Sequence, residues 1–400
     1  MTGLDAWLFA GVFDWPWWGY IAAALALTHV TIVGVTVFLH RCQTHRALTL
    51  GPALSHFFRL WLWLTTGMAT REWVAIHRKH HAKCETADDP HSPQVLGIKR
   101  VLWGGVLLYV TESKNLATIE RYGHGTPDDW LEHHLYSRYV LLGLTIMGLI
   151  DVILFGIVPG ALILVAQIVW IPFWAAGVIN GAGHFYGYRS WPVADASTNL
   201  FPWGILIGGE ELHNNHHAYP TSARLSNKWY EFDIGWMYIR LFEMLGLAQV
   251  KRIAPAAPAL RPDAPRSEVD EAALQAVIAR RYEVLAAYAD AVRPISAAEL
   301  GSRQHLVLRD ARDRRNFQRW LHLNEMPSTD AERLRLVEML STSVTLRTVC
   351  QLRGELAALW DRSNASTTQL AQQLQAWCLR AEASGINALA QFSQRLRRYA

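Results

Sequence analysis

The chain has 400 residues, of which 51% are hydrophobic and 18% are charged, and its formal net charge at pH 7 is +4. This modest charge, without a basic run, argues against a nucleic-acid-binding protein. The 4 cysteines form no CxxC pair, which argues against a zinc finger, a rubredoxin-type iron site and a disulfide framework. Residues 1–250 are apolar and aromatic, so we expect a membrane-embedded domain there and a soluble region after it.

Three apolar stretches of the first domain are candidates to cross a bilayer core, which is about 30 Å thick. They are residues 17–39, 139–157 and 160–179. Pro159 and Gly160 are expected to break the last two stretches apart. The one charge inside these stretches, Asp151, is expected to face protein or to lie near a span end.

Residues 47–70 form a further apolar segment, which His56 and Arg59 interrupt. We predict that this segment lies in the membrane plane or is half-buried, and that it does not cross the membrane. A crossing there would separate two histidine motifs, at residues 40–45 and 77–81, by the membrane.

Basic residues indicate the orientation of the spans, because cytoplasmic loops are rich in Lys and Arg. One basic group follows the first span and comprises Arg41, Arg46, Arg71, Arg78, Lys79, Lys83, Lys99 and Arg100. A second group follows the last span and comprises Arg189, Arg224, Lys228, Lys251 and Arg252. Both groups are expected to face the cytoplasm. Three spans then leave the N-terminus outside, unless residues 3–13 form a re-entrant piece.

The C-terminal part begins with a Pro/Ala-rich linker at residues 251–268. Residues 269–400 have helical periodicity, in stripes that comprise Leu274, Ile278, Leu285, Tyr288 and Val292, then Leu334, Val337 and Leu340, then Leu352, Leu356 and Leu359, then Leu370, Leu374 and Trp377. Thr329 and Glu332 are predicted to form a capping box. The role of this region stays open between docking of an electron donor, self-association, and a helical appendage without a part in catalysis.

Three histidine motifs carry the functional signal: HRCQTH at residues 40–45, HRKHH at 77–81 and HNNHH at 213–217. On a helix, His77 shares a face with both His80 and His81. These two rings diverge by about 100°, so they can serve two neighbouring ions but not easily one. We predict a two-metal centre, since imidazole suits Zn, Cu, Fe and Ni. Its candidate ligands from the motifs are His40, His45, His77, His80, His81, His213, His216 and His217.

The other histidines show no comparable pattern, and we predict that they bind no metal. Those expected at the surface or in the core are His29, His56, His91, His124, His305 and His322. His133 and His134 are expected at the membrane interface, because no third histidine follows them at helical spacing.

Longer motifs surround the histidines: REWVAIHRKHH, ADDPHSP, NGAGHFYGYR and GGEELHNNHHAYP. They closely resemble the membrane fatty-acid desaturases of the acyl-CoA Δ9 (stearoyl-CoA desaturase-like) family, which show EW-x-x-x-HRxHH, D-P-H, N-x-x-x-H-x-x-G-x-R and GE-x-x-HNxHH-x-x-P. The resemblance covers residues 17–250 and the motif set is specific. It implies an all-α integral membrane protein of the bacterial inner membrane, with a cytoplasmic histidine cap on residues 1–250 and a soluble helical C-terminal region.

The resemblance also implies a diiron centre with nine histidine ligands. The ninth is His184, and Asn180 reaches one metal through water. Zinc could substitute for iron at the same rings. The carboxylates expected to accept from ring N–H groups are Glu72, Asp88, Asp89, Glu210 and Glu211. Two features depart from the animal members, which have a second span before the first motif and a Trp at the position of Gly177.

The implied reaction is the O₂-dependent introduction of a cis double bond, at carbon 9, into a fatty acyl-CoA or a phospholipid acyl chain. An unactivated methylene offers no acidic proton, so its oxidation needs a metal and O₂. The sequence has no HPGG haem motif of a fused cytochrome b5 domain. A separate electron donor is therefore expected, either ferredoxin, rubredoxin or a cytochrome b5-like protein, with a reductase.

Two alternatives remain at this stage. A diiron fatty-acid or alkane hydroxylase uses similar histidine motifs but gives an alcohol. A membrane metal transporter or sensor belongs to another class and predicts ligands in the middle of the spans. The motifs here lie at the span ends, which counts against the transporter. The HxxxxH spacing and the GYR and HNNHH contexts favour the desaturase over the hydroxylase.

Overall fold

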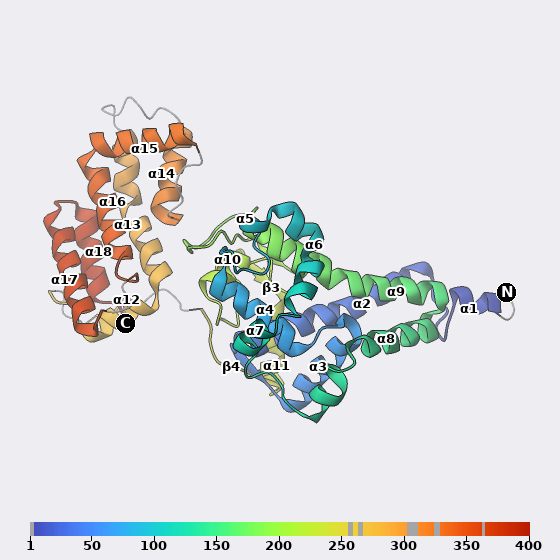
Figure 1. The fold of residues 1–400 in the computed structure, drawn as a ribbon. Coiled ribbons are helices and arrows are strands. Elements are labelled where there is room, and N and C mark those ends of the chain that lie inside the picture. The colour runs from blue at the N-terminus through green and yellow to red at the C-terminus, as the bar shows by residue number, and fades with distance from the viewer. Residues whose placement is uncertain (1–3, 255–258, 263–266, 302–310, 324–328, 362–364) are drawn as a thin grey trace. The chain divides into compact units, whose positions relative to one another are not determined.

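The computed structural model describes the chain apart from residues 1–3, 255–258, 263–266, 302–310, 324–328 and 362–364. The described residues are mostly helical, with four short strands, and they divide into two compact units, Met1–Ala254 and Pro255–Ala400 (Figure 1). The prediction of a mostly helical protein is therefore confirmed. The predicted linker, residues 251–268, lies partly outside the described residues.

The first unit contains the histidine motifs. Its helices and strands are α1 (Leu4–Phe9), α2 (Trp17–Val33), the π-helix η1 (Gly34–Thr44), β1 (Leu48–Leu50), α3 (Pro52–Thr66), α4 (Thr70–Lys83), α5 (Pro93–Leu96), α6 (Ile98–Glu112), α7 (Leu116–Tyr122), the π-helix η2 (Glu132–Tyr136), α8 (Val140–Phe155), α9 (Ile157–Ile171), the π-helix η3 (Pro172–Ile179), the 3₁₀-helix η4 (Ala182–His184), β2 (Trp203–Gly204), α10 (His213–Ala218), β3 (Phe232–Asp233), α11 (Ile234–Met244) and β4 (Ala248–Val250). β1 pairs antiparallel with β4, and β2 pairs parallel with β3. The first pairing ties the chain after the first histidine motif to the end of the unit, since Leu48 lies opposite Val250.

Two long apolar helices of this unit are made of consecutive segments. α2 runs into η1 as Trp17–Thr44, and α9 runs through η3 as Ile157–His184. Each has 28 residues and is long and apolar enough to cross a membrane. α8 has 16 residues, about 24 Å at roughly 1.5 Å per residue, and is shorter than a bilayer core. Two of the three predicted spans therefore reach spanning length.

The break between α8 and α9 lies at Gly156, so the break predicted at Pro159 and Gly160 is wrong. Gly156 has φ 91°, a conformation that residues with a Cβ rarely adopt. Pro159 fits the first turn of α9, where an N–H would have no helical partner. Gly160 serves close packing, because a Cβ there would lie 2.5 Å from the carbonyl oxygen of Asp151.

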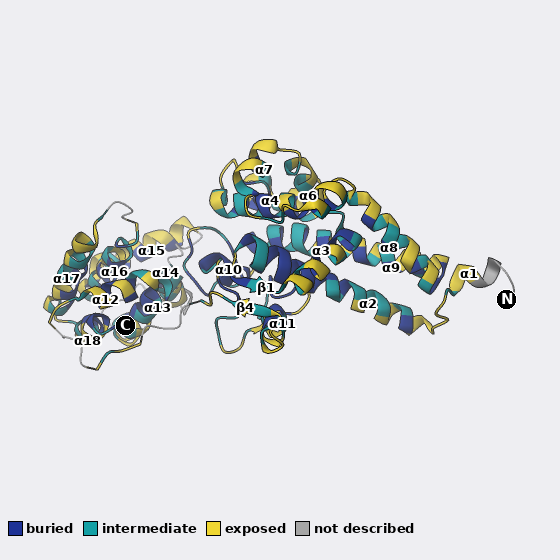
Figure 2. Ribbon diagram, turned by 90° about the horizontal axis from the view of Figure 1, so that it is seen from below, coloured by how far each residue is buried: buried dark blue, intermediate teal, exposed yellow. Residues whose placement is uncertain are grey.

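The contacts between α8 and α9 bury polar atoms, while their outer faces are apolar. Asp151 is buried and accepts a hydrogen bond from Gln167 Nε2 at 2.9 Å, which confirms that it faces protein. Figure 2 shows exposed residues along both helices. Exposed apolar side chains there include Leu141, Leu149, Leu162, Val165 and Val169. Such faces fit lipid better than water and support membrane association.

The segment predicted to lie in the membrane plane forms β1 and α3. One side of α3 is buried, whereas Phe57 and Leu60 on its other side are exposed. The buried Arg59 pairs with Glu132 at 3.1 Å and with Asp129 at 2.5 Å. One side of this segment is therefore buried within the protein, and its single charge has carboxylate partners. Its position relative to the membrane stays a prediction.

The second unit is a helical bundle. Its helices are α12 (Glu271–Ala279), α13 (Arg281–Gly301), α14 (Ala311–Leu323), α15 (Asp330–Thr342), α16 (Val344–Ala357), α17 (Thr367–Ala383) and α18 (Asn387–Arg397). Tyr288, Trp377 and Phe392 meet edge to face in its core, with ring centroids 5.4–6.1 Å apart. The predicted stripes on α12, α13, α16 with the residues after it, and α17 are buried except for the partly buried Ile278 and Leu370, which pack against the same core. The capping box of Thr329 and Glu332 is present.

The predicted stripe on α15 is wrong for Leu334 and Val337, whereas Leu340 packs against the core. Leu334 and Val337 are 70% and 61% exposed, while Leu336 and Met339 face the core. Both pairs have the same three-residue spacing, so periodicity alone does not distinguish them on this helix.

Candidate metal centre

The first two ligand candidates come from a π-helix. His40 lies in η1, and the backbone N–H of His45 donates to the His40 carbonyl oxygen at 3.1 Å. This hydrogen bond spans five residues, as in a π-helix, and the two rings lie at a centroid distance of 4.8 Å. The spacing of the HRCQTH motif is therefore matched to π-helical geometry.

Five rings converge in cluster A, which comprises His40, His45, His77, His81 and His216. His77 Nε2 lies 3.0 Å from His40 Nε2, 3.1 Å from His45 Nε2 and 3.1 Å from His81 Nε2. His216 Nε2 lies 3.1 Å from His40 Nε2 and 2.8 Å from His81 Nε2. The rings come from η1 and the residue that follows it, from α4 and from α10.

Four rings converge in cluster B, which comprises His80, His184, His213 and His217. His184 Nε2 lies 3.2 Å from His80 Nε2 and 3.0 Å from His213 Nε2. The buried His217 Nε2 has no hydrogen-bond partner among the described residues. His80 thus lies in cluster B and its neighbour His81 in cluster A, as their divergence on α4 requires.

The two clusters fit metal ions. A neutral imidazole carries a single N–H, so one hydrogen bond can join one pair of ring nitrogens. It cannot account for an Nε2 atom that lies within hydrogen-bond distance of three other Nε2 atoms. Metal–nitrogen bonds of about 2.0–2.1 Å would bring several Nε2 atoms this close. Burial, and then the neighbouring imidazoles, lowers the pKa of His45, His77 and His81 well below the ordinary value. These rings are therefore neutral and offer lone pairs.

Carboxylates lie on the opposite, Nδ1, side of four rings. The distances are 2.9 Å from His40 to Glu210, 3.0 Å from His80 to Asp89, 3.0 Å from His217 to Asp195 and 3.4 Å from His184 to Glu85. An Nδ1–H held by a carboxylate leaves Nε2 as the ligand atom and fixes the ring orientation.

Of the five predicted carboxylates, Asp89 and Glu210 lie beside rings of the two clusters, and the other three lie elsewhere. Asp88 is exposed and lies 3.5 Å from Lys83 Nζ. Glu211 instead accepts the backbone N–H groups of Ile207 and Gly209. Glu72 is half-buried, and no hydrogen bond joins it to these rings in the part of the chain that the structure describes.

Sequence reasoning missed Glu85 and Asp195. Glu85 follows the second motif by four residues, so its proximity was a usable signal. Asp195 lies 22 residues before His217, and no local spacing connects the two.

Comparisons with known proteins decide the family. A family model described as "Fatty acid desaturase" matches residues 15–242, which include every ring of both clusters. The chain belongs to the fatty acid desaturase family. It is therefore an oxidoreductase. A second model, described as "Transposase", matches residues 269–400.

Curated relatives agree with this family. An sn-1 stearoyl-lipid 9-desaturase of Anabaena variabilis is 32% identical over 241 residues, which are 59% of this chain and 85% of the relative. An sn-1 stearoyl-lipid 9-desaturase of Synechocystis sp. is 32% identical over 245 residues, 60% of this chain and 73% of the relative. An acyl-CoA 5-desaturase of Anemone leveillei is 30% identical over 260 residues, 62% of this chain and 75% of the relative.

A cavity of about 190 Å³ adjoins both clusters of this desaturase. His40 and His77 of cluster A, His213 of cluster B and Asn180 contribute to its wall. Most of the remaining wall is apolar and comprises Val35, Met68, Trp73, Ile76, Val106, Val110, Ile171, Pro172, Ala175, Ala176, Ile179 and Ile207. An apolar ligand in this cavity would lie next to rings of both clusters.

Close packing of α6 on η3 shapes this cavity. A Cβ on Gly105 would lie 2.3 Å from the carbonyl oxygen of Ala176, and a Cβ on Gly177 would lie 2.5 Å from that of Leu102. Gly177, the position that departs from the animal desaturases, therefore has no room for a Trp unless α6 moves.

The histidines predicted to bind no metal lie in varied places. His91 is buried, lines the cavity and stacks on His80 at a centroid distance of 4.4 Å. His29 lies 2.8 Å from the Tyr238 hydroxyl, and the exposed His133 lies 2.6 Å from Asp128. The others are His56 beside Tyr136, the exposed His124, His134 stacked on Trp130, and His322 in the second unit. His305 lies outside the described residues.

Proposed function

We propose that this desaturase introduces a cis double bond at carbon 9 of a saturated fatty acyl chain, at two iron ions held by clusters A and B. The observation that carries the proposal is the convergence of nine imidazoles in two adjacent groups beside an apolar cavity. Bound iron would supply the redox chemistry with O₂ that an unactivated C–H bond requires.

The protein's own residues have three roles in this proposal. The Nε2 atoms hold the metals, and the carboxylates Asp89, Asp195 and Glu210 keep the protons on Nδ1. The apolar cavity binds the alkyl chain and excludes water. Asn180, which lines the cavity, would reach one metal through a water.

The reaction needs a reductant. Removing two hydrogens from a CH₂–CH₂ unit while O₂ becomes two waters consumes two electrons and two protons. A separate donor, ferredoxin, rubredoxin or a cytochrome b5-like protein with its reductase, would supply the electrons.

Two further parts of the proposal are the acyl carrier and the location. The relatives of Anabaena variabilis and Synechocystis sp. are both named as lipid desaturases, which favours the acyl chain of a membrane lipid over acyl-CoA. His40 and His184 lie at the ends of the two long apolar helices. The centre would then sit at the cytoplasmic face of a bacterial inner membrane, where the basic residues collect.

The test is lipid analysis in a host without endogenous desaturation, co-expressing donor and reductase pairs. The wild-type chain should give cis-9 monoenes, located by gas chromatography–mass spectrometry after derivatisation of the double bond. A variant with His80→Ala and His81→Ala should give none. Hydroxylated chains would replace the desaturase proposal by a hydroxylase. Failure to oxidise acyl chains with every donor, despite two bound irons, would reject it.

A further inference from the structure

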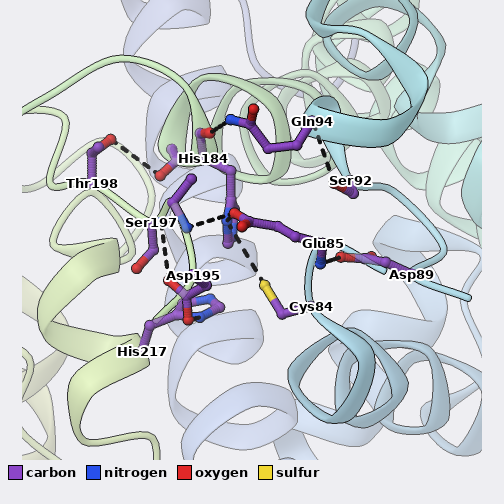
Figure 3. A network of polar contacts seen from close by, with 12 residues as sticks. Cys84, Glu85, Asp89, Ser92, Gln94, His184, Asp195, Ser197, Thr198 and His217 are labelled. Atoms are coloured by element: carbon purple, nitrogen blue, oxygen red, sulfur yellow. Dashed lines mark hydrogen bonds and ion pairs between the residues drawn. The ribbon is translucent and has the colours of Figure 1, made fainter. Parts of the chain in front are cut away.

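Glu85 connects most of the Nδ1 contacts of cluster B, and Figure 3 shows it in the centre of the polar network. Glu85 Oε1 lies 3.4 Å from His184 Nδ1. The same oxygen accepts the backbone N–H of Ala196 at 2.6 Å. In addition, the backbone N–H of Glu85 donates to Asp89 Oδ2 at 2.8 Å.

Two of these contacts lead on to further rings. Asp89 Oδ1 lies 3.0 Å from His80 Nδ1. Ala196 directly follows Asp195, whose Oδ2 lies 3.0 Å from His217 Nδ1. Glu85 therefore contacts the carboxylate partner of His80 and the residue next to the carboxylate partner of His217. It also faces the His184 ring directly.

The backbone of Glu85 supports a functional reading. Its φ is 62°, in the left-handed region that residues with a Cβ rarely adopt. Such a conformation persists where surrounding contacts enforce it, and it concentrates at functional sites. Here it lets the N–H point to Asp89 while the carboxylate reaches the segment at residues 195–197.

We propose that Glu85 is a positioning residue that orients His80, His184 and His217, and thereby sets the metal affinity of cluster B alone. This proposal rests on the metal centre of the proposed function. Cluster A should be independent of Glu85, because the carboxylate beside its His40 is Glu210.

The test measures metal binding by the full-length chain, purified in detergent and stripped of metal. Anaerobic titration with Fe(II) against a chromophoric chelator should give two equivalents for the wild type, one for each cluster. Glu85→Gly keeps the left-handed backbone and removes the carboxylate, and Glu85→Gln keeps the size and removes the charge. In both variants one equivalent should keep its affinity, and the other should bind about 10–100-fold more weakly.

Double variants assign the weakened equivalent to a cluster. His77→Ala removes a ring of cluster A, so His77→Ala with Glu85→Gly should leave no tight equivalent. His184→Ala removes a ring of cluster B, so adding Glu85→Gly to it should leave one tight equivalent, as His184→Ala does alone. A purely structural role of Glu85 would weaken both clusters together.

Asp88→Asn is the matched control, because Asp88 lies three residues away, is exposed and pairs with Lys83. It should retain two tight equivalents. Full retention of both equivalents in Glu85→Gly and Glu85→Gln, or loss of both together, would overturn the proposal. A wild-type chain that binds fewer than two would instead count against the proposed metal centre.

Discussion

Arg41 and Asp233 form a buried bidentate ion pair between η1 and the start of α11, with Nη2 to Oδ1 at 2.9 Å and Nη1 to Oδ2 at 3.0 Å. The Arg41 guanidinium also donates to the carbonyl oxygens of Gly208 and Ala223. Because His40 precedes Arg41, this pair fixes the end of η1 next to cluster A. Asp233 in turn caps α11 by accepting the backbone N–H of Trp236.

The variant Asp233→Asn should destabilise the first unit strongly. It removes one partner of a buried pair, and an uncompensated buried charge costs about 3–5 kcal/mol. Denaturant unfolding in micelles measures this loss. Glu243→Gln is the control, since the exposed pair of Arg240 and Glu243 should contribute less than about 1 kcal/mol. Equal stabilities of the two variants would contradict the prediction.

Adjacent glycines of α6 provide a matched test of the cavity. Gly105→Ala would bring a Cβ to 2.3 Å from the Ala176 carbonyl oxygen, so α6 must move away from η3 and the cavity wall with it. We expect product formation to fall at least about tenfold, which corresponds to about 1.4 kcal/mol of transition-state stabilisation. Gly104→Ala meets no atom within 4 Å and should retain activity. The monoene yield at equal protein level is the measurement.

A single ring of cluster A provides a test of the metal count. His77 Nε2 contacts three other Nε2 atoms, so His77→Ala should lower the iron content from two ions per chain to one and abolish desaturation. Elemental analysis of the purified chain gives the iron content. His134→Ala, an exposed ring stacked on Trp130, should keep both ions. Two ions retained in His77→Ala would remove this residue from the ligand set.

The histidine clusters could be anticipated because helical spacing is a local property. The positions of His77, His80 and His81 on α4 follow from 3.6 residues per turn, and the sequence alone shows them. His184 has no motif of its own and was expected only through the family resemblance. Its place in cluster B depends on the fold that brings η4 to α4 and α10.

The carboxylates show where local reasoning ends. Asp88 and Asp89 are neighbours, yet only Asp89 reaches a ring, because the turn after α4 directs one inward and the other to solvent. Asp195 meets His217 across 22 residues, through loop packing that no spacing encodes. The helix break at Gly156 could not be located from the sequence either. Pro159 and Gly160 look like a break, but a proline is also compatible with the first turn of a helix, where both residues lie in α9.

The second unit should be dispensable for the chemistry and should unfold independently. Its core is closed by its own side chains, among them Trp377, which is 1% exposed and donates to the Leu352 carbonyl oxygen at 2.8 Å. Trp377→Ala should therefore lower the stability of this unit by about 3–5 kcal/mol. At temperatures below its new melting transition, monoene formation should be unchanged, as it should be after truncation at Ala254. A truncated chain that binds iron at wild-type levels but forms no monoene would contradict this prediction and leave donor docking or self-association as the role of residues 255–400, since the metal centre itself would be intact.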